Sequence, residues 1–269
     1  MEFMINDEIL YLNKNGDKFP IKICKEKLLT NNIYWSFTTV ALANSLDADD
    51  LHHSFREQYI GSNHYLSDEG YVFDYQNHML SGVFLDVPDS NFDGGTFLLE
   101  CLKSELIEGI PYALNPIKFN AIRVADFRYL SNDLDYLVCI SKNGIFSQKD
   151  KILRIRIHER LDLFFINNEH CGFILKYPII SLVRFADFDL LSSKVNANQY
   201  IDLSKYKNTF ISYFNVMDDN VWDKLEERNI DVKNTLNDIV FKLRDADLSK
   251  EPLYALKEQC TRLLSDYYE

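Results

Sequence analysis

The sequence has few of the features that mark export or membrane insertion. Its 269 residues contain no apolar run near the roughly 18 residues that a membrane helix needs. The first residues, MEFMINDEIL, have neither the basic segment nor the apolar stretch of a signal peptide. We therefore expect a cytoplasmic protein that does not bind a membrane.

Cysteine is scarce, and its spacing shows no pairing. The five cysteines lie far apart, and the chain has no CxxC sequence. This excludes a zinc ribbon, a redox motif and a disulfide framework. We expect reduced, buried thiols that behave as small apolar residues. These residues are Cys24, Cys101, Cys139, Cys171 and Cys260.

Positive charge is scarce in the first part of the chain. Residues 1–100 hold 16 acidic and 6 basic residues, and the whole chain has a net charge of −12. Arg56 is the only basic residue between Lys27 and Lys103, a stretch that contains eleven acids. Binding to nucleic acid needs a basic surface, so it is excluded, and a basic protein is the expected partner.

Sequence motifs of catalysis are also missing. The chain has no Gly-x-Ser-x-Gly nucleophile motif and no His-Glu-x-x-His zinc motif. The segment NFDGGTF lacks the glycine spacing and the Lys-Ser/Thr of a phosphate loop, and it reads as a turn. Acidic pairs such as Asp133/Asp135 and Asp187/Asp189 are expected by chance in so acidic a chain. We therefore expect no enzyme activity and no cofactor.

Most of the chain has the composition of β-strands. Runs rich in β-branched and aromatic residues predict strands at 19–24, 33–43, 71–75, 78–87, 135–140, 151–158, 162–166 and 172–177. In KILRIRIH the alternation predicts a half-buried strand on which Lys151, Arg154 and Arg156 keep some charge exposed.

After Asp218 the apolar spacing changes to that of helices. One stripe runs from Val232 to Leu243 and a second from Leu253 to Tyr267, with a shorter helix expected near 220–228. Ser249 is the expected N-cap of the last helix, whose first turn tolerates Pro252.

These patterns predict an α+β fold with a mostly antiparallel, β-rich body, an acidic N-terminal helix and a C-terminal helical hairpin. We expect an acidic, aromatic-rich α/β subdomain at 1–110. A β-rich subdomain follows at 111–269, closed by helices at 216–269, with no flexible linker.

The stretch DADDLHHSFREQY, residues 47–59, is the expected N-terminal helix. Leu51, Phe55 and Tyr59 recur every four residues and form its buried edge. The opposite face gathers three groups that could bind a divalent ion, or simply face solvent: Asp49, His53 and Glu57.

Acidic and aromatic residues are concentrated together at 28–102, which hold eleven acids, one base and twelve aromatics. Aromatic area supplies affinity at interfaces, and charge complementarity supplies steering and specificity. The expected partner-binding residues are Asp47, Asp49, Asp50, Glu57, Tyr65, Asp68, Glu69, Tyr71 and Asp74.

The sequence therefore predicts a non-enzymatic acidic binding protein that occludes a basic toxin or effector. Its composition resembles the general profile of bacterial immunity and antitoxin proteins. Two alternatives stay open. One is a metal-dependent hydrolase that uses Asp49, His53 and Glu57 with His64. The other is a structural or adaptor component of a phage or secretion assembly.

Overall fold

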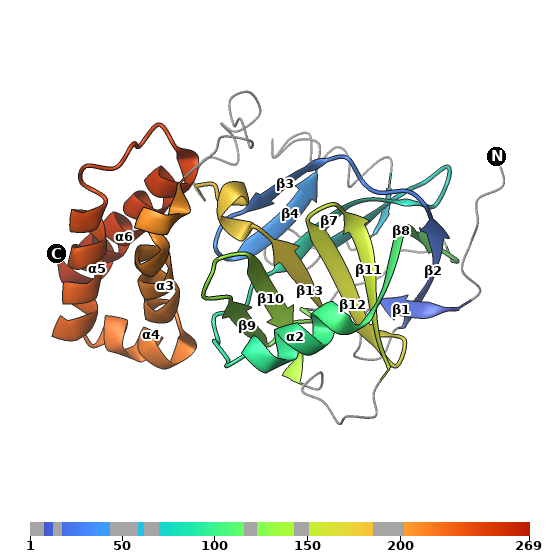
Figure 1. The fold of residues 1–269 in the computed structure, drawn as a ribbon, viewed down its shortest axis with the longest axis horizontal. Coiled ribbons are helices and arrows are strands. Elements are labelled where there is room, and N and C mark those ends of the chain that lie inside the picture. Colours follow the sequence, from blue (N-terminus) through green and yellow to red (C-terminus); the bar gives the residue numbers. More distant parts are fainter. Residues whose placement is uncertain are drawn as a thin grey trace.

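The computed structural model describes residues 8–12, 18–43, 59–61, 70–115, 123–142, 151–184 and 202–269. The protein has a mixed α+β fold in which two sheets form a β-rich body (Figure 1). Four C-terminal helices lie together at one side of this body. Within the described ranges, no helix is both long and apolar enough to cross a bilayer.

Six strands of the larger sheet form a closed ring, a small barrel. They are β1 (Leu10–Leu12), β2 (Phe19–Lys25), β8 (Glu105–Ala113), β11 (Ile152–His158), β12 (Leu161–Ile166) and β13 (Glu169–Lys176). The ring closes because β1 pairs in parallel with the start of β13, at Glu169. Apart from β8 with β11, the other neighbours in the ring are antiparallel.

A second layer covers the outside of the barrel. β10 (Tyr136–Ile140) extends the sheet from β13, and β9 (Phe127–Leu130) forms its edge. The helix α2 (Gly95–Lys103) packs there with Phe97, Leu98 and Cys101, against apolar residues that include Phe164. β12 is buried along its whole length because its alternate residues face the barrel core and this outer cluster.

The smaller sheet is antiparallel and comes from the N-terminal part of the chain. Its strands are β3 (Asn32–Trp35), β4 (Thr39–Ala43), β7 (Leu80–Asp86), β6 (Gly70–Asp74) and β5 (Tyr59–Gly61). The run at 33–43, expected as one strand, is a hairpin. Phe37 has a φ of 68° at its tight turn, and the Ser36 N–H donates to the Thr39 carbonyl (3.0 Å).

The C-terminal helices confirm the helical periodicity of this region. They are α3 (Lys207–Val216), α4 (Asp219–Glu226), α5 (Ile230–Lys242) and α6 (Glu251–Tyr268). Helix α6 begins one residue later than expected, with Lys250 at the N-cap, and Pro252 lies in its first turn. The helix α3 begins within the region expected to be β-rich and packs on α5, so the unit is larger than a hairpin.

The expected acidic helix at 47–59 lies outside the described residues except at its last position. Tyr59 is the first residue of β5, so its place on a helical stripe was wrong. The expected subdomain boundary at 110/111 falls within β8. The expectation of buried cysteines without disulfides is confirmed for all five.

Candidate functional site

Most of the expected partner-binding residues lie outside the described part of the chain. These are Asp47, Asp49, Asp50, Glu57, Tyr65, Asp68 and Glu69, and the possible metal ligand His53 lies there too. Tyr71 and Asp74 are described, and both belong to β6.

Tyr71 is a core residue rather than a surface contact. It is 1% exposed, and its hydroxyl lies 3.0 Å from Nδ1 of His170. The other ring nitrogen of His170 lies 3.0 Å from the Gly172 carbonyl, which can only accept. Nε2 therefore carries the proton and Nδ1 accepts from Tyr71. Because a buried side chain cannot touch a partner directly, we remove Tyr71 from the expected surface.

Asp74 shapes a turn at the end of β6. Its carboxylate accepts the backbone N–H groups of Gln76 (2.8 Å) and Asn77 (2.9 Å). The neighbouring Tyr75 is 67% exposed. Asp74 therefore has a local structural role, and because it is partly exposed it stays among the expected partner-binding residues.

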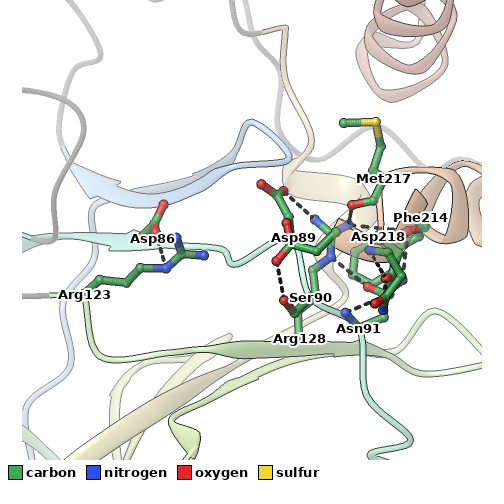
Figure 2. A network of polar contacts seen from close by, with 11 residues as sticks. Asp86, Asp89, Ser90, Asn91, Arg123, Arg128, Phe214, Met217 and Asp218 are labelled. Carbon is green, nitrogen blue, oxygen red and sulfur yellow. Dashed lines mark hydrogen bonds and ion pairs between the residues drawn. The ribbon is translucent and has the colours of Figure 1, made fainter. Parts of the chain in front are cut away.

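A buried arginine joins the β-rich body to the helices (Figure 2). The Arg128 side chain is 3% exposed, and its Nε donates to Oδ1 of Asn91 (2.9 Å). A terminal nitrogen donates to the carbonyls of Phe214 (3.4 Å) and Met217, at the end of α3. Helix C-termini favour a positive group, so this placement stabilises both the helix and the buried charge. Arg128 thus links β9 to α3.

Three carboxylates gather around this arginine. Asp89 lies 3.5 Å from Arg128, and Asp218 accepts the Asn91 N–H (2.9 Å) beside Asp219 at the start of α4. Burial raises the pKa of Asp89; Arg128 opposes that shift, and the two aspartates add to it. This part of the molecule therefore carries more negative than positive charge, and its central cation is buried.

A small cavity lies where the body meets the helices, and we call it the junction pocket. Its volume is about 120 Å³. The body contributes the turn at 36–38, Asp89 and Arg128; the helices contribute Tyr213, Phe214, Met217, Gln259 and Arg262. Substrate pockets are usually about 300–1,000 Å³, so this one has no room for a large substrate.

Tyr213 places a protonated hydroxyl at this pocket. The residue is 2% exposed, and its ring packs 4.6 Å from that of Phe37. Burial raises the pKa of Tyr213, so the hydroxyl keeps its proton. It makes no hydrogen bond of standard geometry within the described residues, although Gln259 and Arg262 are polar neighbours. The pocket therefore contains an available donor.

A second charged cluster lies on the barrel and corrects the reading of KILRIRIH. Arg154 is 5% exposed rather than partly solvated. Its guanidinium lies 3.4 Å from the fully buried Asp162, which Arg156 contacts at 2.9 Å and Lys176 at 3.7 Å. Arg154 also donates to the Leu102 carbonyl at the end of α2 (3.0 Å). These cations therefore stabilise the barrel wall and do not form a basic surface.

Among the described residues, no group of three potential metal ligands is found. Asp133 and Asp135 belong to one turn, where Asp133 accepts from the Ser131 hydroxyl and the Asp135 N–H. These hydrogen bonds, led by that of Ser131, lower the pKa of Asp133. The metal alternative at Asp49, His53 and Glu57 lies outside the described residues.

The sequence reading missed Arg128 and Tyr213. A usable signal was present in the segment DFRYL, where Arg128 is the one charge inside a short strand. A charge placed among apolar strand residues needs a buried partner. Nothing local identifies that partner, because α3 lies about 85 residues further along the chain.

Comparison with known proteins adds no relative. The chain matches no family model, no curated protein and no solved structure. The functional argument therefore depends on the residues themselves.

Proposed function

We propose that this protein is a non-enzymatic acidic binding protein that occludes a basic toxin or effector in the cytoplasm, as an immunity or antitoxin protein does. The observation that carries the proposal is the distribution of charge. The side chains of Arg128, Arg154, Arg156 and Arg160 are between 3% and 19% exposed, so the body holds these cations internally. Acids outnumber bases by 41 to 29, and many remain at the surface.

Exposed acids lie close to the Arg128 network. Asp93 follows the loop that holds Asp89, and α4 exposes Asp219, Asp223 and Glu226. A negative field of this kind accelerates the approach of a basic protein and disfavours acidic competitors. We propose that the expected partner-binding residues at 47–74, with the exception of the buried Tyr71, also contact the partner, and that binding blocks the partner sterically.

The test compares two variants of equal net charge. In one, Asp49, Asp50 and Glu57 are replaced by Lys; in the control, Asp231, Asp238 and Asp245, exposed acids of α5 and its C-terminal end, are replaced by Lys. Each chain is immobilised and exposed to lysate of its own cells at about 50 and about 300 mM salt, which shortens the Debye length roughly 2.5-fold.

We expect the unaltered chain to retain a basic protein at low salt. The association rate of that protein, measured with purified components, should fall as salt rises. At low salt, the association rate should be lower for the first variant than for the control, because only the first variant changes the binding surface. A retained partner that is acidic, or whose association rate is the same for all three chains, would contradict the proposal.

A further inference from the structure

Three donors from three different elements meet at the junction pocket. They are Arg128 of β9, Tyr213 of α3 and Arg262 of α6. The longest contact of Arg128 is the 3.5 Å separation between its terminal nitrogen Nη1 and Asp89, so this nitrogen is the least engaged. The Tyr213 hydroxyl is buried beside the Gln259 amide and makes no hydrogen bond of standard geometry among the described residues. Arg262 is exposed and forms no ion pair with any residue in the described ranges.

The charge of the lining favours an anion. Among the residues that line the pocket, Arg128 and Arg262 contribute two positive charges and Asp89 contributes one negative charge. Asp218 and Asp219 lie near Asp89 but do not line the pocket, so the lining itself carries one net positive charge within a more acidic surrounding. The rest of the chain is strongly acidic. A buried cation and a buried hydroxyl both gain from an acceptor that replaces lost water, and charged acceptors form the stronger bonds.

The remaining lining is apolar and the space is small. Phe37, Phe214 and Met217 face the pocket beside the donors. A volume of about 120 Å³ has room for several water molecules or for one small ligand. A ligand of a few heavy atoms with one charged end and one apolar end matches both the size and the lining.

We propose that the junction pocket binds a small carboxylate with a short carbon chain, such as acetate or propionate. The carboxylate accepts from Tyr213, Arg128 and Arg262, and the carbon chain contacts Phe37 and Met217. Because the body and the helices both supply donors, the bound carboxylate connects them. This inference goes beyond the proposed covering of a basic partner, since it concerns an internal pocket and a ligand of opposite charge.

The experiment titrates the full chain with sodium propionate, at ionic strength held constant with sodium chloride. Ligand-detected NMR reports binding, and the thermal midpoint reports stabilisation of the folded state. We expect saturable binding with a dissociation constant of about 0.1–10 mM, the range open to so few heavy atoms. Inorganic phosphate, which lacks a carbon chain, and hexanoate, which exceeds the space, should each bind at least about tenfold more weakly.

Two variants and one control locate the site. Tyr213→Phe removes a hydroxyl that makes no hydrogen bond in the described structure, so folding should persist while affinity falls about tenfold. Arg262→Gln should weaken binding about threefold, because its charge is exposed. Arg244→Gln, which removes an exposed arginine paired with Asp245, should change nothing.

Several results would overturn the proposal. One is the absence of saturation at about 50 mM propionate, which would mean that the pocket holds water only. Another is an affinity unchanged by Tyr213→Phe, which would place the ligand elsewhere. Phosphate binding as tightly as propionate would exclude the carbon-chain preference. None of these results depends on whether a basic partner exists.

Discussion

Replacing Arg128 with Met tests the buried link between the body and the helices. Met keeps the apolar part of the side chain and removes the guanidinium. The Asn91 side-chain oxygen and the Met217 carbonyl then lose this donor, whereas the Phe214 carbonyl keeps a bond from Asn91 (3.1 Å). Removing one partner of a buried ion pair costs about 3–5 kcal/mol. We expect the lower end, about 3 kcal/mol, because Asp89 is 42% exposed and can be solvated.

The two tryptophans allow the loss to be followed in each part of the molecule. Trp35 is buried in β3, and Trp222 lies on α4 beside Tyr267. Urea unfolding is recorded by fluorescence in Trp35→Phe and Trp222→Phe backgrounds, so that each protein has one reporter. With a urea dependence of about 3 kcal/mol per molar, a loss of about 3 kcal/mol lowers the midpoint by about 1 M. The Trp222 signal should shift at least as far as the Trp35 signal, because Arg128 bonds directly to α3.

Arg123→Met is the matched control. Arg123 pairs with Asp86 at 2.7 Å in the same region, but its side chain is 46% exposed (Figure 2). An exposed pair contributes about 0.2–1 kcal/mol, so the midpoint should move by no more than about 0.3 M. If Arg128→Met shifts the midpoint no further than Arg123→Met, the network does not hold the helices on the body and the reasoning fails.

Two further predictions concern the barrel. Burial, with a further contribution from Arg160, lowers the pKa of His158 below its ordinary value of 6.5. The unfolded chain therefore takes up a proton first as the pH falls, and the folded state loses stability below about pH 6.5. His158→Gln should reduce this loss, which urea titrations between about pH 7.5 and 5 would show; an unchanged slope would refute it. Gly172 has a φ of 154°, and a Cβ added there would lie 2.0 Å from the Cys139 carbonyl oxygen. Gly172→Ala should cost more than about 3 kcal/mol, because that oxygen belongs to the paired strand β10. Gly95→Ala is the control, because a Cβ added there would lie 3.5 Å from its nearest neighbour, and the thermal midpoint should change by no more than about 2 °C. Equal effects of the two substitutions would contradict this argument.

The local elements of this protein were largely predictable from its sequence. β12 and β13 follow from short apolar runs, and the stripe of α5 follows from the spacing of Val232, Leu236 and Ile239, all of which are buried. Such patterns depend on neighbours in the chain alone, since the side-chain period of a strand or helix is a property of its backbone. The absence of disulfides was also predictable, because the five cysteines are odd in number and show no paired spacing such as CxxC.

Errors arose where a residue's environment came from elsewhere in the chain. Alternation along β11 predicted exposed charge at Arg154, but α2 and the buried Asp162 cover it. The segment NFDGGTF indicated a turn, but its last three residues, from Gly95 to Phe97, begin α2. Phe97 became part of a helix because an outer face of the barrel was available to bury it. Tyr71 looked suited to a recognition loop, yet His170, 99 residues away, supplies a buried acceptor.

The sequence by itself determined the acidic balance, the mixed secondary structure and the buried stripes of the helices. Only the tertiary structure decided which polar groups became partners. Arg128, Tyr213 and Arg262 come from three separate elements, and they meet because the helices pack against the end of the body. A buried charge must find its partner wherever packing places one, and no local period in the sequence encodes that distance.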